Sequence, residues 1–266
     1  MEADGGTTLV AIPTGERMLA GLRTYFAGIP QFSLGSPYAV IIACDVSGYE
    51  DPKIREFTRK IAGKGYYVVV PDFCRGDPFL PDPPGGGGRP FADWLEDHDP
   101  SGDALEDAKL VSKILGYSQK GIGAIGVGWG AKVVAELTMP WSNDYAYHIN
   151  SAVLLDPFSV TLDDFKGGYV PTLVSGAEIN HDHASSQSCE LFRELSDSLS
   201  TKSEIVRLVK LFPNVANRWS LGQDSDHEEG VREDDEEVLA DVFDWLSKHM
   251  RRSPDPREFR GAQNFI

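Results

Sequence analysis

The sequence is poor in cysteine, in basic residues and in long apolar runs. Its 266 residues include three cysteines, Cys44, Cys74 and Cys189, and this odd number with irregular spacing excludes a regular disulfide framework. Such sparse cysteine is typical of a reducing compartment. No apolar run approaches the roughly 18 residues that a membrane-spanning helix needs. The first residues are acidic, which is unlike a secretory or transit peptide. We therefore expect a cytoplasmic protein without a membrane segment.

Positive charge is scarce relative to negative charge. The chain has 25 Lys and Arg against 41 Asp and Glu, which gives a formal net charge of −16. This balance disfavours nucleic acids and anionic membranes as partners. Nine acidic residues and one basic residue fall between Asp224 and Glu237. A solvated acidic loop that runs into a helix explains this segment most simply, and a docking patch for a basic protein partner is the alternative.

Strand-like and helix-like segments alternate along the chain. Tyr38–Cys44 is continuously apolar, as in a strand buried on both faces, and Pro52–Lys64 has the pattern of a helix with proline in its first turn. The other expected strands are 66–70, 121–127, 152–155, 172–175 and 205–212, and the other expected helices are 104–115, 131–137, 185–199 and 236–250. This alternation predicts an α/β fold whose mainly parallel, doubly wound sheet carries helices on both faces.

We expect one domain with additions at its two ends. Residues 1–28 are expected to add an edge strand or hairpin, residues 29–250 to form the α/β domain, and residues 251–266 to be an extended or disordered tail. Within the domain, residues 77–90 contain a proline-rich stretch and four consecutive glycines. This composition excludes regular structure and predicts a mobile loop.

The segment Gly126–Gly130 carries the most specific signal. Its G-x-G-x-G spacing, between an expected strand and an expected helix, matches the sharp turn that presents a nucleophile at the top of an α/β-hydrolase sheet. The flanking glycines suit a tight turn with close packing of strand on helix. The central position, however, holds Gly128, which has no atom that can attack a substrate.

Several short motifs together resemble the dienelactone hydrolase family, especially its plant-type members, from about Gly21 to Lys248. The motifs are Asp45-Val46-Ser47-Gly48-Tyr49-Glu50, Val69-Val70-Pro71-Asp72-Phe73, Gly76-Asp77-Pro78, Trp129-Gly130-Ala131-Lys132, Gly176-Ala177-Glu178-Ile179 and Phe212-Pro213-Asn214-Val215-Ala216. The resemblance implies an α/β-hydrolase fold and a Cys-His-Asp triad.

All three triad positions depart from the family pattern. The resemblance puts the nucleophile at Gly128, the acid at Asn180 and the histidine at Asn217, and neither glycine nor an amide can act as nucleophile or general base. It also implies an oxyanion hole made by the backbone N–H groups of Val46 and Trp129, which survive a change of side chain. Trp129 itself could line a pocket or be buried under its helix.

Other residues near the expected strand ends could supply chemistry. Asp182 could replace the missing acid, and Arg75 or Arg218 could bind a carboxylate, although surface ion pairs are the plainer interpretation for both arginines. The remaining candidates are thiols, hydroxyls and histidines, namely Cys44, Cys74, Ser47, Ser175, His181 and His183. Packing or turn chemistry explains the thiols and hydroxyls, and the two histidines lack further ligands for a metal. We expect no metal and no cofactor.

A dinucleotide-binding protein is a rival interpretation. Gly126, Gly128 and Ala131 satisfy the G-x-G-x-x-A fingerprint, and Asp156 follows the next expected strand. Two strand–helix units precede this motif, however, whereas the fingerprint usually opens its domain. The sequence therefore predicts a hydrolase-fold protein without its family's nucleophilic chemistry. Such a protein would bind a small carboxylate or lactone, or a protein partner through residues 224–237 or the tail. A weak or relocated ester or lactone hydrolase is the alternative.

Overall fold

The computed structural model describes residues 12–30, 35–81, 87–139, 149–166, 168, 170–177, 207–212 and 229–250. Its strands are β1 (Thr14–Leu19), β2 (Leu22–Ala27), β3 (Tyr38–Ala43), β4 (Tyr67–Pro71), β5 (Gly121–Val127), β6 (Ser151–Leu155), β7 (Thr172–Ala177) and β8 (Arg207–Phe212). Its helices are α1 (Pro52–Ala62), α2 (Phe91–Asp97), α3 (Asp103–Gly116), α4 (Trp129–Leu137), α5 (Asp163–Lys166) and α7 (Glu229–His249).

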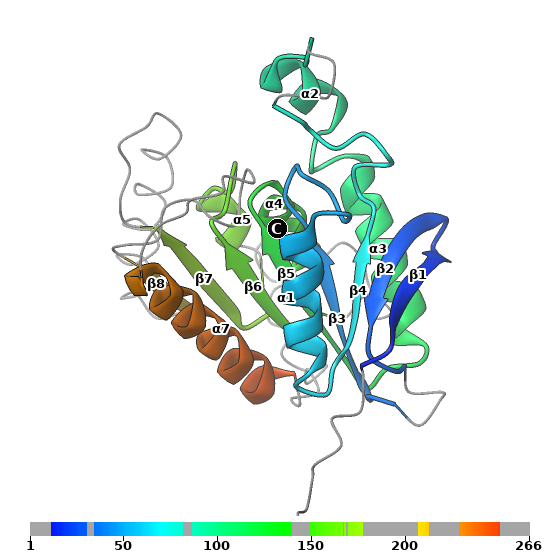
Figure 1. The fold of residues 1–266 in the computed structure, drawn as a ribbon, viewed down its shortest axis with the longest axis vertical. Helices are drawn as coiled ribbons and strands as arrows, with labels where there is room; N and C mark the ends of the chain where they lie inside the picture. Colours follow the sequence, from blue (N-terminus) through cyan, green and yellow to red (C-terminus); the bar gives the residue numbers. More distant parts are fainter. Residues whose placement is uncertain are drawn as a thin grey trace, which may run out of the picture.

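The eight strands form one sheet in the order β1-β2-β4-β3-β5-β6-β7-β8. The hairpin β1–β2 is antiparallel, β2 pairs antiparallel with β4, and the remaining strands are parallel. Because each crossover between parallel strands needs a covering segment, helices lie on both faces of the sheet (Figure 1). The predicted α/β fold with a mainly parallel sheet is confirmed.

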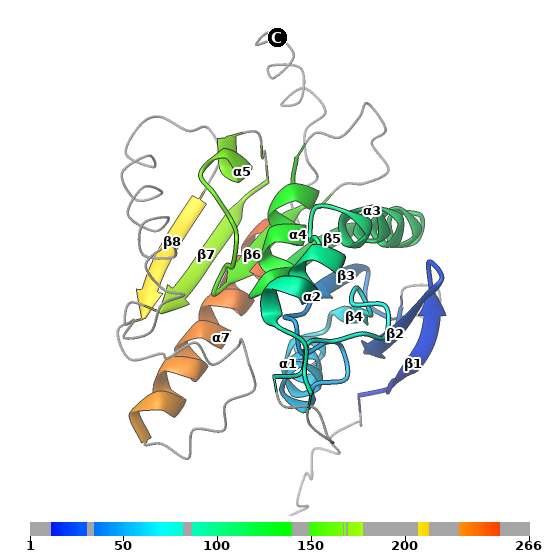
Figure 2. The same ribbon diagram turned by 90° about the horizontal axis from the view of Figure 1, so that it is seen from above.

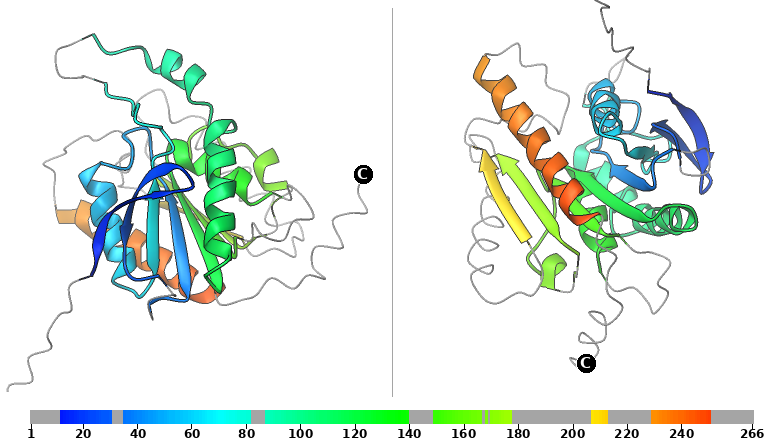
Figure 3. Two further views of the ribbon diagram at one scale, coloured as in Figure 1. Left: turned by 90° about the vertical axis from the view of Figure 1, so that its right-hand side faces the viewer. Right: turned by 90° about the horizontal axis from the view of Figure 1, so that it is seen from below.

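Two apolar clusters lie on opposite faces of the sheet. In β3, Ile41 packs with α3 and α4, whereas Val40 and Ile42 pack with α1 and α7. This alternation follows from the period of two along a strand. Figure 3 shows α7 crossing one face and α3 standing beside the hairpin on the other. The central strands β3, β4, β5 and β6 are therefore buried on both sides, as their apolar sequences predict.

Some element boundaries differ from the sequence expectations. Helix α7 begins at Glu229 instead of Glu236, so it includes part of the acidic segment. Helix α3 includes Gly116 as its last residue. The short helices α2 and α5 were not predicted. The expected helix 185–199 and the tail 251–266 lie outside the described residues.

The carboxyl ends of the parallel strands meet at the upper edge of the sheet in Figure 1, and α2 stands over this edge (Figures 1 and 2). In a sheet of this type, ligands bind beyond the carboxyl ends of the strands. No helix in the described ranges is both long enough and apolar enough to cross a membrane.

Candidate functional site

The turn from β5 into α4 has the geometry of a nucleophile elbow. Gly128 has φ 53° and ψ −116°, a conformation that strains any residue with a Cβ. Its N–H donates to the Leu155 carbonyl at 2.9 Å, and its carbonyl accepts from the N–H groups of Ala131 and Phe158, both at 3.1 Å. These bonds fix the turn between β5, β6 and α4.

The two flanking glycines are required by close backbone packing. A Cβ on Gly126 would lie 2.5 Å from Ala131 Cα, and a Cβ on Gly130 would lie 2.6 Å from the Cys44 carbonyl oxygen. Real Cβ atoms essentially never come so close to backbone atoms. The G-x-G-x-G pattern therefore has a steric cause, which is the packing of α4 directly against β5 and β3.

The carboxylate of Asp45 fills the space next to Gly128. Parallel pairing sets Ala43 of β3 against Gly126 of β5, so two residues further along Asp45 stands beside Gly128. Asp45 is 3% exposed, and its Oδ1 accepts a 2.9 Å hydrogen bond from the backbone N–H of Trp129. A Cβ built on Gly128 would overlap this carboxylate, at 2.5 Å from its Cγ. A carboxylate thus stands where an elbow side chain would begin.

The buried thiols near this edge of the sheet are held in their protonated form. Burial raises the pKa of Cys44 well above its ordinary value, and the nearby thiol of Cys74 and the carboxylates of Asp45 and Asp72 raise it further. Burial is the main cause that raises the pKa of Cys74 to about 12, and the charge of Asp72 is the second cause. Since a thiolate is the nucleophilic form of cysteine, neither thiol is activated.

The carboxylate of Asp72, just beyond β4, is also destabilised by burial. Burial raises its pKa, while hydrogen bonds from the backbone N–H groups of Gly76 and Arg75 and the charge of Arg23 lower it. Asp45 is thus the carboxylate next to Gly128, whereas Asp72 follows β4, which β3 separates from β5.

Arg75 is engaged by carboxylates of α3. Its Nη1 donates to Asp103 at 2.6 Å, and its Nε and Nη2 donate to Asp107 at 3.0 and 2.9 Å. The hydrogen bond to Asp107 is the main reason that the pKa of Arg75 is raised. The structure thus shows the surface ion pairs that were the plainer interpretation of this arginine.

Trp129 is buried, which settles the interpretation that the sequence left open. It is 1% exposed and its Nε1 donates to the carbonyl of His98 at 2.9 Å. Trp94 of α2 meets Trp129 edge-on, with ring centroids 5.8 Å apart. The aromatic cluster around Trp94 also contains Phe79, Phe91 and Phe158. Trp129 therefore ties α2 to the turn at Gly128.

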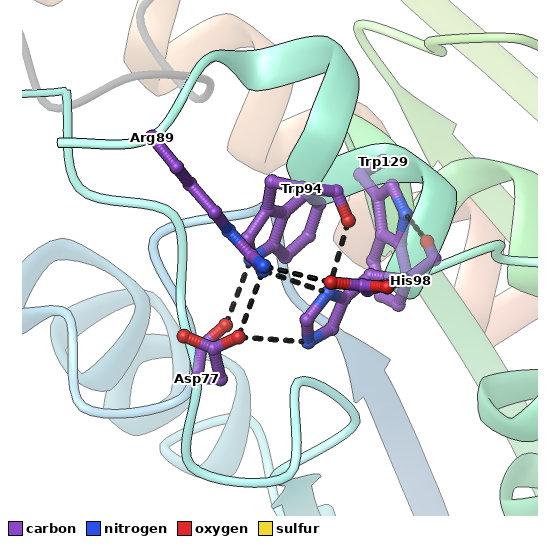
Figure 4. A network of polar contacts seen from close by, with 6 residues as sticks. Asp77, Arg89, Trp94, His98 and Trp129 are labelled. Carbon is purple, nitrogen blue, oxygen red and sulfur yellow. Dashed lines mark hydrogen bonds and ion pairs between the residues drawn. The ribbon is translucent and has the colours of Figure 1, made fainter.

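A polar network surrounds the imidazole of His98 (Figure 4). His98 stacks on Trp94 with ring centroids 4.3 Å apart and an interplanar angle of 3°. Its Nε2 lies 3.6 Å from Asp77 Oδ2, and this carboxylate also accepts from Arg89 at 2.8 Å. The Nε1 of Trp94 donates to the Asp77 carbonyl at 2.8 Å. Asp77 thus connects His98, which follows α2, to the segment that follows β4.

The structure places only part of the predicted site. Val46 is buried beside Asp45, and its carbonyl accepts from Phe79 N–H at 2.8 Å, while its part in an oxyanion hole stays a prediction. The other predicted site residues lie outside the described residues: Asn180, His181, Asp182, His183, Asn217 and Arg218. In the described ranges no three His, Cys, Asp or Glu side chains gather to hold a metal ion.

Two features of the site were not recognised in the sequence. Asp45 was placed at the crevice, but its position against Gly128 was not predicted, although equal spacing from the ends of two paired strands could have indicated it. The stack of His98 on Trp94 has the i, i+4 spacing of one helical turn. Both signals are present in the sequence. The first can be interpreted only when the order of the strands is known, and the second only when helix α2 is known.

Comparison with protein families identifies the domain. The sequence model of the dienelactone hydrolase family matches residues 23–250. A maize protein named endo-1,3;1,4-beta-D-glucanase is 38% identical over 158 residues, which are 59% of this chain and 46% of the maize protein. A carboxymethylenebutenolidase homolog of Xenopus tropicalis is 25% identical over 217 residues, 80% of this chain and 82% of the relative. The matched part therefore spans less than half of the maize protein and most of the frog protein.

Solved structures show the same fold. A Klebsiella pneumoniae protein described as a dienelactone hydrolase matches with a TM-score of 0.62 at 17% identity, over 90% of this chain and all of that chain. The dienelactone hydrolase of Anabaena variabilis matches with a TM-score of 0.54 at 12% identity, over 90% of this chain and 98% of that one. The family match favours the elbow interpretation of Gly126–Gly130 over a dinucleotide fingerprint.

Proposed function

This chain belongs to the dienelactone hydrolase family, and we propose that it is a non-catalytic member, which binds a small ligand or a protein partner instead of cleaving a substrate. The hydrogen bond from Trp129 N–H to Asp45, next to Gly128, carries this proposal. By resemblance, Trp129 N–H is the donor that would stabilise the oxyanion of a reaction intermediate. Here a carboxylate already accepts that hydrogen bond.

The chemistry at the turn supports this proposal in two ways. Gly128 offers no nucleophile, and losing the triad of a serine protease costs roughly a millionfold in turnover. An oxyanion that formed beside Asp45 would also face a buried carboxylate at close range, which destabilises it. The first effect removes the attacking group, and the second removes the stabilisation of the intermediate.

The same charges favour a neutral ligand. Asp45 opposes a carboxylate next to Gly128, and Arg75 is already paired with Asp103 and Asp107. Of the two ligand classes that the sequence suggests, a lactone therefore suits the crevice better than a small carboxylate. A carboxylate ligand would depend on Arg218. If the ligand is a macromolecule, it is a basic protein that binds at residues 224–237. The small number of cysteines supports a cytoplasmic location.

A weak ester or lactone hydrolase is the second candidate, and two observations favour it. The relatives bear the names of hydrolases, and the Asp45 carboxylate stands where a base could take a proton from water. In that reaction, water would attack the acyl carbon while Asp45 accepts its proton, and the alcohol would leave with a proton in return. Occupation of Trp129 N–H by Asp45 makes this the weaker candidate.

Hydrolysis assays distinguish the two candidates. Purified protein, Gly128→Ala and Asp45→Asn would be incubated with aryl esters and simple lactones. We expect the same background rate for all three proteins, together with a rise in melting temperature of the unmodified protein in the presence of a lactone. Hydrolysis by the unmodified protein that is lost in Asp45→Asn would overturn the non-catalytic proposal and support the second candidate.

A further inference from the structure

Helix α2 is attached to the rest of the domain by two indole hydrogen bonds and by one group whose charge depends on pH. The Nε1 of Trp94 donates to the Asp77 carbonyl at 2.8 Å, and the Nε1 of Trp129 donates to the carbonyl of His98, the residue after α2, at 2.9 Å. Both bonds join neutral groups, so pH does not alter them. The third attachment is the imidazole of His98, which faces the Asp77 carboxylate (Figure 4).

The contacts of this imidazole assign the hydrogen of the neutral ring to Nδ1. His98 Nδ1 lies 3.0 Å from the Trp94 carbonyl oxygen, and because a carbonyl oxygen can only accept, Nδ1 is the donor. Nε2 of the neutral ring is then an acceptor. It lies 3.6 Å from Asp77 Oδ2, so two acceptors face each other. A proton at Nε2 converts this contact into an ion pair.

The charged groups around the imidazole come from three segments. The segment after β4 contributes Asp77, the segment before α2 contributes Arg89, and α2 contributes Asp97. Arg89 Nη2 lies 3.3 Å from His98 Nδ1 and opposes a positive ring, but Arg89 is itself paired with Asp77 and Asp97, both at 2.8 Å. Helix α4 contributes the neutral indole of Trp129. Two carboxylates thus offset one guanidinium, and the group as a whole favours a protonated His98.

We propose that His98, Asp77 and Arg89 form a pH-dependent clasp that controls how often α2 separates from the edge of the sheet. Protonation of His98 Nε2 tightens the clasp, because it adds an ion pair to Asp77 across the junction between α2 and the segment after β4. Loss of the proton loosens it. Since Trp94 of α2 contacts Trp129 directly after Gly128, the clasp regulates access to the turn. It is a property of α2 and does not depend on what the crevice binds.

The clasp acts between about pH 8 and pH 5, where histidine titrates and a carboxylate stays ionised. The attraction exists only with the proton on His98, so it stabilises closed α2 at the acidic end of this range and is lost as pH rises. The side chain of Asp77 is 61% exposed and that of His98 is 13% exposed, so solvent weakens the pair. Pairs of this kind change an equilibrium by about two- to fivefold.

Native-state hydrogen exchange of the full chain tests the clasp, with exchange rates corrected for the intrinsic effect of pH on amides. The opening equilibrium of α2 is compared with that of α3, which serves as the internal reference. We expect opening of α2 to fall about two- to fivefold from pH 8 to pH 5.5, while opening of α3 stays constant. In about 1 M salt, where charges are screened within about 3 Å, the change for α2 should be smaller.

Three variants identify the groups responsible. His98→Gln removes the titrating ring, and Asp77→Asn removes its partner, so each should abolish the pH dependence of α2 opening. Asp93→Asn is the matched control, because it removes the same charge from an exposed position in the first turn of α2, and it should keep the pH dependence. If His98→Gln fails to fold, Asp77→Asn alone provides the comparison, since its side chain is largely exposed.

Four results would overturn the clasp. One is opening of α2 that does not change with pH, and another is opening that increases as pH falls. A third is a pH dependence that Asp77→Asn leaves intact, which would assign the titration to another group. The fourth is opening of α2 and α3 together at every pH, which would show that α2 separates only when the whole domain unfolds.

Discussion

The turn at Gly128 and the aromatic cluster around Trp94 lie side by side, yet different forces hold them. At the turn, backbone atoms pack so closely that Gly126 and Gly130 cannot carry a side chain. At the cluster, large rings and their polar edges hold α2 against α4, as in the edge-on contact of Trp94 with Trp129 and the hydrogen bond from Trp129 Nε1 to the His98 carbonyl. The first region has the backbone geometry of a nucleophile elbow, with a glycine at its central position. The comparison shows that close backbone packing alone accounts for the glycines of the turn, whereas side-chain contacts anchor α2.

The largest expected effect is at the turn. Gly130→Val would force a Cβ to 2.6 Å from the Cys44 carbonyl, and buried backbone on both sides leaves no room to relax. We expect destabilisation of more than about 4 kcal/mol, or failure to fold. Denaturant unfolding and soluble yield measure this loss.

Gly63→Ala is the matched control, because Gly63 has an ordinary helical conformation and its new Cβ would lie 3.3 Å from the Lys60 carbonyl oxygen, a tight contact that a small shift relieves. It should change stability by less than about 1 kcal/mol. A stable Gly130→Val protein would mean that α4 does not pack on β3 and β5 as described.

The next effect is at the aromatic cluster. Trp94→Ala should cost about 3–5 kcal/mol, since it removes a large buried side chain and leaves the Asp77 carbonyl without its indole donor. Trp94→Phe keeps a stacking ring and should lose less. Thermal or denaturant unfolding of both variants gives the comparison. Equal stability of Trp94→Ala and the unmodified protein would show that α2 is not anchored through this ring.

A smaller effect is expected at the apex of the turn. Gly128→Cys places a Cβ at φ 53° and against the Asp45 carboxylate, and such backbone strain costs about 1–3 kcal/mol. The variant should melt at a lower temperature and should not gain esterase activity. Adding Asp45→Gly should restore part of the stability. A Gly128→Cys protein with an equal or higher melting temperature would contradict the described turn.

The smallest effect is the pH dependence contributed by Asp72. Burial raises the pKa of its carboxyl, so the folded state binds this proton more tightly than the unfolded state. The resulting stabilisation is complete below the ordinary aspartate pKa and is lost as pH rises through the raised value. The unmodified protein should therefore gain stability relative to Asp72→Asn as pH falls from 7 toward 4. Melting temperatures of both proteins across this range measure the difference, and the opposite trend would contradict the assigned burial.

The sequence predicted the fold where local pattern and burial agree. Apolar runs such as Tyr38–Cys44 predicted the parallel sheet, and the glycines of Gly126–Gly130 predicted the turn. Both structures restrict which residues fit, and this restriction is visible in the local sequence. Helix α2 was missed, because its contacts with Phe79 and Trp129 come from distant parts of the chain. Asp45 was likewise placed at the correct edge of the sheet, but only the pairing of β3 with β5 brings it next to Gly128.

Covalent trapping at the turn tests the central claim most directly. The protein would be exposed to thiol-directed and serine-directed ester probes under native conditions, and its intact mass and labelled peptides would be measured. We expect no rapid stoichiometric adduct, because Gly128 offers no nucleophile and the pKa values of Cys44 and Cys74 are raised. Rapid labelling of a single residue, one equivalent per chain, would contradict the account and establish a working nucleophile.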